Sequence, residues 1–337
     1  MDLILLIPVF ISLILVIFFL PKWIKKCHFT GLLWEDMNKF SHPKNVASSG
    51  GIMVIISFVL GVLLYVSFRT FIFQNIESNL EIFSLLTSIL ILGIIGLTDD
   101  LLGWKNNGLS KRFRLFLILF ASIPLVVINA GVHKINLPIL GNIDLGIWYP
   151  LFLIPLGIMG ATATYNFLAG FNGLETSQGI LIIGFLSYIS YITGTAWLAV
   201  VGLCMVAALL GFYIFNKFPA LVFPGDVLTY PIGGFIAIMA ILGNFEKIAA
   251  FVFIPYIIET GLKLRGGLKK HSFAIPNPDG SLELPYKKIY SLTHLSILIL
   301  KKFKNKVYEK DVVYLINLFQ IIIILLSLLL FKQFIYT

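Results

Sequence analysis

The run TSQGILIIGFLSYISYITGTAWLAVVGLCMVAALLGFYIFN, residues 176–216, contains 41 residues and no charged side chain. As a single α-helix it would be roughly 61 Å long, about twice the thickness of the hydrocarbon core of a bilayer. The run must therefore turn back on itself, and Thr193 to Thr195, with Gly194 between them, form the natural turn. We expect two consecutive transmembrane helices here.

The composition of the whole chain is that of a membrane protein. Hydrophobic residues make up 58% of the sequence and charged residues 12%, whereas soluble domains carry about 25% charged residues. Further predicted spans are residues 3–20, 52–68, 82–98, 113–130, 147–168, 227–242, 247–262 and 312–331. With the folded pair, the sequence predicts an all-α polytopic protein of about ten transmembrane helices, organised as one domain over residues 1–337.

The basic residues gather on one side of this arrangement. The connecting segments 21–51, 99–112, 169–178, 216–226 and 263–311, together with Arg114, hold 21 of the 25 Lys and Arg residues. Cytosolic loops of membrane proteins collect basic residues, so these segments are predicted to be cytosolic and both termini external. This pattern accounts for the net charge of +9, and we expect no nucleic-acid partner. Cys27 and Cys204 form no disulfide or metal-binding pattern.

Two connections carry signals of their own. On the external side, KINLPIL, then Gly141-Asn142, then IDLGIW predicts a small β-hairpin with its turn at the Gly-Asn pair. On the cytosolic side, residues 263–311 form a long loop before the last helix. It contains a flexible basic stretch suited to a diphosphate (Gly266, Gly267, Lys269, Lys270 and His271), a strand after Asp279-Gly280, and an apolar run, 292–300, too short to span. The later lysines Lys301, Lys302, Lys304 and Lys306 are predicted to contact anionic headgroups.

Acidic residues stand at the cytosolic ends of the predicted helices. In GLTDDLLGWKNNGLSKRFR, residues 96–114, Asp99 and Asp100 form a local double negative charge that calls for a nearby cation. Mg²⁺ takes oxygen ligands and often binds through carboxylates shared with substrate phosphates. Lys111 follows closely, so a site for a phosphorylated substrate is expected. Arg114 is interpreted as an ordinary basic residue at the membrane boundary.

Two further polar segments lie on the same side. NFLAGFNGLE, residues 166–175, combines two amides, two glycines and Glu175 at a helix-to-loop junction, as expected of a nucleotide or base pocket. In FPALVFPGDVLTY, residues 218–230, Pro224 and Gly225 force a turn just before Asp226. Taken alone, this carboxylate is interpreted as a helix cap.

These segments resemble those of the polyprenyl-phosphate N-acetylhexosamine-1-phosphate transferases, glycosyltransferase family 4. Within that family the resemblance is strongest to the eukaryotic and archaeal dolichyl-phosphate N-acetylglucosamine-1-phosphate transferases. It rests on GLTDD, NFLAGFNGLE and FPGDVLTY in this order, and it runs from the first helix to the last. The resemblance implies the following roles: Asn166 and Asp226 hold Mg²⁺, with Mn²⁺ as an alternative; Asn172 and Gly170 lie at the uridine, with Glu175 beside them; Lys111 contacts phosphate; Asp99 and Asp100 lie at the lipid-phosphate end; Lys269 and His271 take the positions of basic residues on the donor; and residues 33–51 help cover the site.

The implied reaction transfers N-acetylglucosamine 1-phosphate from UDP-N-acetylglucosamine to dolichyl or another polyprenyl phosphate and releases UMP, the first step of lipid-linked oligosaccharide synthesis for N-glycosylation. We expect a cytosolic active site, in an archaeal cell membrane rather than endoplasmic reticulum, and leave a homodimer open. Direct attack by the lipid phosphate is favoured over an aspartyl-phosphate intermediate through Asp99 or Asp100, and inversion or retention at phosphorus with a chiral donor separates the two.

Two alternatives to this function stay open. One is the same reaction with another UDP-N-acetyl sugar, for cell-envelope glycan. The other is a multi-spanning transporter, a class that often shows internal repeats and charges near the middle of helices. We find no internal repeat, and the acidic residues lie at helix ends.

Overall fold

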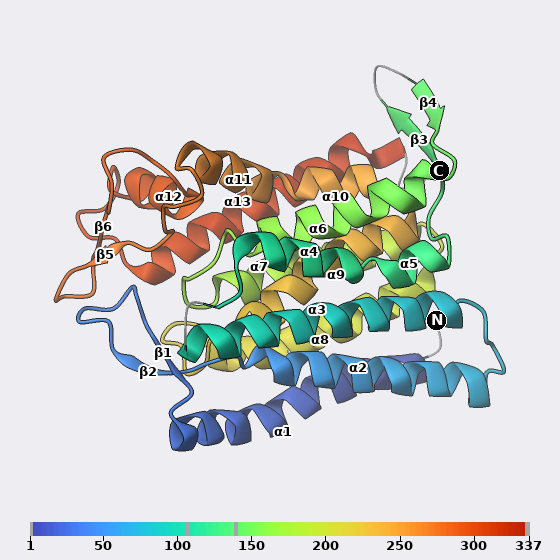
Figure 1. The fold of residues 1–337 in the computed structure, drawn as a ribbon, viewed down its shortest axis with the longest axis horizontal. Coiled ribbons are helices and arrows are strands. Elements are labelled where there is room, and N and C mark those ends of the chain that lie inside the picture. Colours follow the sequence, from blue (N-terminus) through green and yellow to red (C-terminus); the bar gives the residue numbers. More distant parts are fainter. Residues whose placement is uncertain (1–2, 106–107, 138–140, 334–337) are drawn as a thin grey trace.

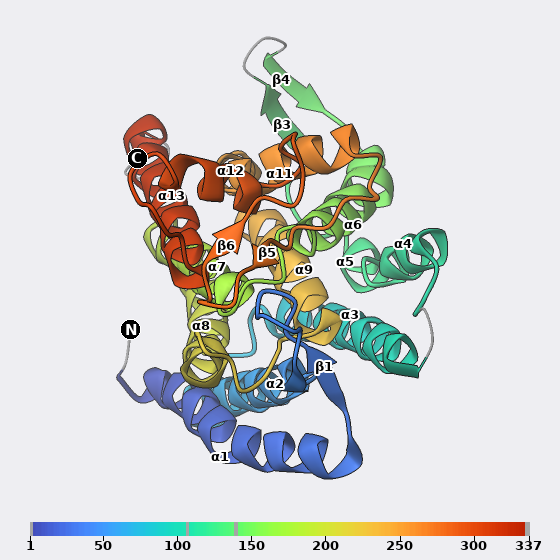
Figure 2. The same cartoon turned by 90° about the vertical axis from the view of Figure 1, so that its left-hand side faces the viewer.

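Helix α9 (Asp226–Gly243) lies at the centre of the protein, surrounded by α2, α3, α6, α7 and α8. The computed structural model describes residues 3–105, 108–137 and 141–333, and these are mostly helical. In the end-on view of Figure 2, the other helices are arranged around α9. Its sequence, DVLTYPIGGFIAIMAILG, suits this position because Gly233 and Gly234 let α6 and α3 approach α9 closely.

Six helices in the described residues are long and apolar enough to cross a membrane. They are α1 (Ile7–Thr30), preceded by the 3-10 turn η1 (Leu3–Leu6); α2 (Gly51–Ser67), continued by the π-turn η2 (Phe68–Ile72); α3 (Asn79–Lys105); α8 (Ala196–Asn216); α9; and α13 (Glu309–Leu330). This arrangement fits a polytopic helical membrane protein, but the predicted number of ten spans is not confirmed.

The other predicted spans are divided or less apolar. Residues 113–130 form α4 (Lys111–Phe120) and α5 (Ile123–Val127), residues 147–168 form the π-turn η3 (Tyr149–Leu153) and α6 (Ile154–Tyr165), and residues 247–262 form α10 (Glu246–Val252) and α11 (Ile254–Arg265). Each of the last helical pieces has a proline in its first turn. Because proline lacks an N–H group and clashes with the preceding turn, it interrupts the helix between α4 and α5 and between α10 and α11. In contrast, η3 and α6 run on as one helix, Tyr149–Tyr165, which is shorter than the six candidate spans.

The charge-free run 176–216 turns back on itself at Gly194 as predicted, but of its two helices only α8 is among the six described helices that are long and apolar enough to span. Helix α7 (Leu174–Ile192) and α8 pack against one another, joined at Thr193 to Thr195. Gly194 has φ of 88°, a left-handed conformation that glycine adopts without strain. The first turn of α7 carries Glu175 and other polar residues, which is why this helix is less apolar than α8.

Three antiparallel strand pairs accompany the helices, so the fold is mostly rather than entirely α. They are β1 (Leu33–Glu35) with β2 (Lys44–Ala47), β3 (Lys134–Leu137) with β4 (Gly141–Asp144), and β5 (Ile275–Pro276) with β6 (Leu282–Glu283). The predicted hairpin 134–144 is confirmed, but its turn is not at Gly141-Asn142, because both residues belong to β4. The intervening residues 138–140 lie outside the described residues. The pair β1–β2 was not predicted.

The long segment before the last helix is a folded unit. Helix α12 (Leu292–Leu300) packs against α11 and α13 instead of spanning, as its length predicts. Three of the four lysines predicted to contact headgroups form ion pairs within the segment: Lys301 with Glu283, Lys304 with Asp311 and Lys306 with Asp279. The last pair lowers the pKa of Asp279 and raises that of Lys306.

The predicted cytosolic segments gather at one end of the molecule. In Figure 1, β1, β2, β5, β6 and α12 lie at the left-hand end. The hairpin β3–β4, the start of α1 and the end of α13 lie at the opposite end. The arrangement of the chain therefore agrees with the two-sided charge distribution of the sequence.

Helices α3 and α9 approach each other closely at the end that carries the polar segments. A Cβ atom added at Gly96 would overlap the carbonyl group of Asp226, and one added at Gly233, on the other side of α9, would meet the backbone of α6. Small residues at such crossings let helix backbones come together within a membrane. Gly96 therefore fixes how far the start of α9 lies from α3.

We predict that Gly96→Ala lowers the free energy of unfolding by about 1–3 kcal/mol, the usual cost of overpacking. The measurement is the thermal midpoint of the detergent-solubilised protein. Gly157→Ala is the matched control, because a Cβ atom at Gly157 meets nothing within 4 Å. Equal midpoints for the two variants would contradict the close approach.

Candidate active site

A cavity of about 330 Å³ opens where α3 and α6 end, where α9 begins and where the β1–β2 connection crosses over them. Its wall includes six of the residues singled out from the sequence: Asp99, Asp100, Asn166, Gly170, Glu175 and Asp226. Residues of the predicted cover also line it, namely Trp34 to Met37 and Ser48. The three polar segments, which lie between residues 96 and 230 of the sequence, therefore meet in one place.

Asp100 binds the first turn of α9. Its Oδ1 accepts a hydrogen bond from the Asp226 N–H at 2.8 Å, and its Oδ2 accepts one from the Val227 N–H at 3.2 Å. The first N–H groups of a helix have no partner within it, so a carboxylate at this end is favoured by hydrogen bonding and by the helix dipole. The cap interpretation given to Asp226 therefore applies to Asp100, and Asp226 is left facing the cavity.

Arg114 lies between the other two aspartates. Its Nη1 is 2.8 Å from Asp99 Oδ2 and 3.3 Å from Asp226 Oδ2, and it donates to the Tyr230 hydroxyl at 2.7 Å. Asp99 Oδ1 accepts from the Leu109 N–H at 2.7 Å. The interpretation of Arg114 as an ordinary basic residue at the membrane boundary was wrong. Its position on α4 turns it toward the carboxylates instead of the headgroups.

Asn166 and the loop after α6 form another wall of the cavity. Asn166 Oδ1 accepts from the Thr229 hydroxyl at 3.1 Å, which sets the orientation of the amide group. Glu175, at the start of α7, accepts from the Gly170 N–H at 2.7 Å and so closes the loop. Gly170 has φ of 102°, and a Cβ atom there would overlap the ring of Phe273. Only glycine fits this position.

Asn172 is buried beside the cavity and lines neither of the two cavities described in this section. Its N–H donates to Glu309 at 2.7 Å, and its side-chain amide donates to Asp36 at 3.2 Å. Asn38 joins the same cluster, because its Nδ2 donates to the Gly170 carbonyl at 2.7 Å. These contacts connect the β1–β2 loop, the segment 166–175 and the last helix, and the uridine role of Asn172 stays a prediction.

A second, basic cavity of about 420 Å³ adjoins the first and shares Arg114, Asn166, Gly170 and Phe273 with it. Its cationic lining consists of Lys111, Arg114, Lys263, Lys269, Lys270 and His271, the last counted as a basic side chain. Leu115, Ile118 and Phe167 form an apolar wall. Lys111 is exposed, and its Nζ donates to the Leu268 carbonyl at 2.8 Å. The predicted phosphate-binding residues are thus brought together on one side of the carboxylates.

The donor set fits a hard divalent cation. Among the described residues, no group of three or more His, Cys, Asp or Glu side chains is placed to hold a metal alone. Mg²⁺ commonly binds through one or two carboxylates and completes its octahedron with water and substrate phosphates. Asp226 and Asn166 offer oxygen atoms to the first cavity, and both oxygens of Asp100 are already engaged by N–H groups.

Comparison with known proteins shows the family of this chain. The family model described as Glycosyl transferase family 4 matches residues 82–244, which include all three polar segments. A chain from Saccharolobus solfataricus, provisionally named UDP-N-acetylglucosamine–dolichyl-phosphate N-acetylglucosaminephosphotransferase, is 35% identical over 302 residues, which are 89% of this chain and 88% of that one. The chain belongs to glycosyl transferase family 4.

Two further relatives show the breadth of this family. A UDP-N-acetylglucosamine–dolichyl-phosphate N-acetylglucosaminephosphotransferase from Dictyostelium discoideum is 31% identical over 260 residues, 66% of this chain and 62% of its own. A phospho-N-acetylmuramoyl-pentapeptide-transferase from Clostridium perfringens is 36% identical over 174 residues, 50% of this chain and 55% of its own. Membership in glycosyl transferase family 4 identifies this chain as a glycosyl-1-phosphate transferase and favours this class over a transporter.

Several residues of this candidate site were not recognised from the sequence. Tyr230 lies four residues after Asp226, and Arg114 lies three residues after Lys111, so each shares a helix face with a residue that was recognised. Helical spacing could therefore have marked both residues as candidates, but it does not show which groups they contact. Asp36 and Asn38 lie within residues 33–51, which were predicted to cover the site, but neither residue was singled out. Glu309 carried no local signal, because it reaches the site only through tertiary contacts.

We predict that Arg114→Met lowers glycosyl-1-phosphate transfer at least about 100-fold, the usual cost of losing a preorganised donor in an active site. Lys111→Met should lower it less than about tenfold, because exposed charges are screened by solvent. Arg112→Met, an exposed neighbour on the same helix, is the control. The measurement is the initial rate with folded protein of equal concentration. A larger loss in Lys111→Met than in Arg114→Met would contradict this assignment.

Proposed function

We propose that this protein transfers N-acetylglucosamine 1-phosphate from UDP-N-acetylglucosamine to dolichyl or another polyprenyl phosphate and releases UMP. The observation that carries the proposal is the joining of an acidic and a basic cavity around Arg114, Asn166 and Gly170. A nucleotide diphosphate and a lipid phosphate are both anionic, so a site for both needs cations beside any metal-binding carboxylates. The names of the Saccharolobus and Dictyostelium relatives support this donor and acceptor.

The dimensions of the site suit these substrates. Ligand pockets commonly enclose about 300–1,000 Å³, and each of the two cavities falls in this range. The apolar wall formed by Leu115, Ile118 and Phe167 lies on the basic side. We assign the lipid phosphate and the donor diphosphate to the shared region, so that the prenyl chain can leave along this wall.

The chemistry is a single displacement at phosphorus. An oxygen of the lipid phosphate attacks the β-phosphorus of the donor and forms a new P–O bond. The bond between the β-phosphorus and the bridging oxygen breaks, and that oxygen leaves with the electron pair as part of UMP. The lipid phosphate is largely ionised near neutral pH, with a second pKa of about 6 by analogy with phosphoamino acids, so a strong general base is not required.

The protein's task is then to bring two anions together and to stabilise charge. Arg114 contacts Asp99 and Asp226, and the basic residues Lys111, Lys269 and His271 line the adjoining cavity, so together they would offset the charge of the phosphates. A Mg²⁺ ion held by Asp226 and Asn166 would neutralise charge on the diphosphate and polarise its oxygens. We propose Mg²⁺ as the cofactor, with Mn²⁺ as a substitute, because both prefer oxygen ligands.

The contacts of the aspartate pair favour direct attack over a covalent intermediate. Both carboxylate oxygens of Asp100 accept backbone hydrogen bonds, which weakens it as a nucleophile. Asp99 is bound by Arg114 and by the Leu109 N–H. An enzyme nucleophile would need a free oxygen aimed at phosphorus, whereas both side chains are occupied with holding α4 and α9 in place.

A second donor is supported by one comparison. The Clostridium relative carries a name that specifies a muramoyl-pentapeptide group, and its match covers half of this chain. The same reaction on another UDP-N-acetyl sugar is therefore the alternative. We place the active site at the cytosolic face of an archaeal cell membrane, supported by the basic loops of this end and by archaeal relatives from Saccharolobus and Sulfolobus.

We predict that the purified protein releases UMP from UDP-N-acetylglucosamine only when polyprenyl phosphate and Mg²⁺ are present. Asp226→Asn should lower this rate at least about 100-fold, because it removes one charge from the metal site. Asp144→Asn on the distant hairpin is the matched control and should stay within about twofold of wild type, as surface changes usually do.

Competition among UDP-sugars in the same assay identifies the donor. Faster turnover of UDP-N-acetylmuramoyl-pentapeptide than of UDP-N-acetylglucosamine would overturn the proposed donor. Wild-type activity in Asp226→Asn would overturn the metal assignment, and activity without polyprenyl phosphate would overturn the acceptor.

A further inference from the structure

The basic loop, residues 266–274, brings Lys269, Lys270 and His271 to the second cavity. The ring of Phe273, in the same loop, lines both cavities and lies against Gly170. Gly267 and Leu268 have positive φ values of 61° and 56°, so the loop bends sharply where it leaves α11. Its position therefore depends on contacts beyond its own backbone.

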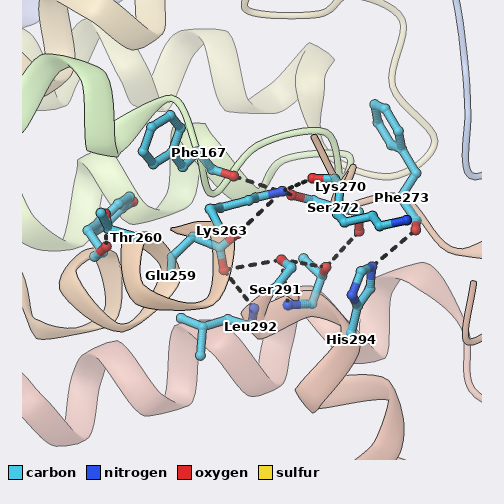
Figure 3. A network of polar contacts seen from close by, with 12 residues as sticks. Phe167, Glu259, Thr260, Lys263, Lys270, Ser272, Phe273, Ser291, Leu292 and His294 are labelled. Atoms are coloured by element: carbon cyan, nitrogen blue, oxygen red, sulfur yellow. Dashed lines mark hydrogen bonds and ion pairs between the residues drawn. The ribbon is translucent and has the colours of Figure 1, made fainter. Parts of the chain in front are cut away.

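A buried ion pair on α11 lies directly beneath this loop. Glu259 is fully buried and Lys263 is 7% exposed, and their charged groups are 3.7 Å apart. Glu259 Oε2 accepts hydrogen bonds from the Leu292 N–H at 2.6 Å and the Ser291 hydroxyl at 3.1 Å, which holds the start of α12 (Figure 3). Burying two charges is costly unless their hydrogen-bonding capacity is used.

Lys263 donates hydrogen bonds to the basic loop. Its Nζ donates to the Ser272 hydroxyl at 2.6 Å and to the Lys270 carbonyl at 3.1 Å (Figure 3). The Ser272 hydroxyl in turn donates to the Phe167 carbonyl at 3.2 Å. Phe167 directly follows Asn166, so one chain of hydrogen bonds connects α11, the basic loop and the end of α6 that carries a proposed metal ligand.

Two residues of α12 and one of the β1–β2 loop hold the far half of the basic loop. The Thr293 hydroxyl donates to the Ser272 carbonyl at 2.7 Å, and His294 Nε2 lies 3.3 Å from the Phe273 carbonyl. Burial lowers the pKa of His294, so its neutral ring can donate through Nε2. Asn38 Oδ1 accepts from the Ala274 N–H at 3.1 Å.

We propose that Lys263 is a positioning residue for the donor diphosphate, and that it acts by fixing the basic loop against the end of α6. Without the Lys263 ammonium, Ser272 and the Lys270 carbonyl lose a hydrogen-bond donor. The cations of the basic loop are then no longer held in place relative to Asn166. The inference rests on the proposed function for its substrate. A purely structural ion pair would instead affect stability alone.

The two roles separate in a double variant. Lys263→Met by itself leaves Glu259 buried without a cation, and this variant can fail to fold. Glu259→Gln/Lys263→Met removes both charges, keeps an oxygen to accept from Leu292 and Ser291, and still lacks the donor to the basic loop. Replacing a buried ion pair by uncharged groups of similar size is often neutral for stability.

Gln320→Met supplies the matched control. Gln320 is buried, and its Nε2 donates to the Val252 carbonyl at 2.9 Å, between α13 and α10. The change removes one buried hydrogen bond without touching the basic loop. Ser272→Ala removes only the hydroxyl that joins Lys263 to Phe167, and it reports on the loop with little change to the core.

The experiment measures the KM for UDP-N-acetylglucosamine, the KM for polyprenyl phosphate and the rate of tryptic cleavage after Lys269 and Lys270. In the double variant we expect a donor KM raised about tenfold or more, since a misplacement of about 1 Å can cost about 100-fold. The acceptor KM should change less than about twofold, and cleavage in the basic loop should accelerate without substrate. Ser272→Ala should shift the donor KM and the cleavage rate in the same direction, and Gln320→Met neither.

Each outcome decides the proposal. A folded double variant with unchanged donor KM and unchanged cleavage overturns it, as does an equal rise of the donor KM in Gln320→Met. If the double variant does not fold, Ser272→Ala decides by the same two measurements. An inactive wild-type protein refutes the proposed function instead. The cleavage rates then still test whether Lys263 holds the basic loop in place.

Discussion

The hydrogen bonds from the first N–H groups of α9 to the Asp100 carboxylate fix the geometry on which the site depends. They attach the start of the most buried helix to the end of α3, where Gly96 lets the two backbones meet. Asp226, Thr229 and Tyr230 lie in the first turn of α9 and face α3, α4 and α6 from there. Because Asp100 already binds the first N–H groups of α9, the carboxylate of Asp226 is free to face the cavity.

The remaining parts of the site are loops held against this framework by buried polar contacts. The β1–β2 loop is bound to the segment 166–175 through Asn38 and Asp36, and to the last helix through Lys39 and Glu309. The basic loop is bound from below by Lys263 and from the side by α12. These hydrogen bonds favour one position of each loop, because a buried polar group that loses its partner is destabilising.

Much of this could be predicted from the sequence, since it is written in local patterns. The turn at Gly194 and the short helix 292–300 follow from the length of apolar runs. The hairpin 134–144 was also predicted, although its turn does not lie at Gly141-Asn142 as expected. The motifs containing Asp99, Asn166 and Asp226 located the cavity. The number of spans was less predictable, because hydropathy does not register how a proline such as Pro124 or Pro255 divides a helix.

Other features depend on tertiary contacts that no local pattern reveals. Arg114 resembles the many basic residues at membrane boundaries, and only the orientation of α4 turns it toward Asp99. Glu259 and Lys263 have the spacing of an ordinary exposed helix pair, yet α12 and the basic loop cover them. Asn172 lies in a motif that predicts a ligand contact, but its side-chain amide donates a hydrogen bond to Asp36.

Under the proposed function, the acidic and basic cavities form one site for a nucleotide diphosphate. The most direct measurement is a structure determined by electron cryo-microscopy with UDP-N-acetylglucosamine and Mg²⁺ bound. We expect density for the diphosphate of UDP-N-acetylglucosamine between Asp226 and Asn166 on one side and Arg114 and the basic loop on the other. Density confined to the apolar cavity near Tyr149 at the opposite end, or lying away from Arg114 and Asp226, would contradict it.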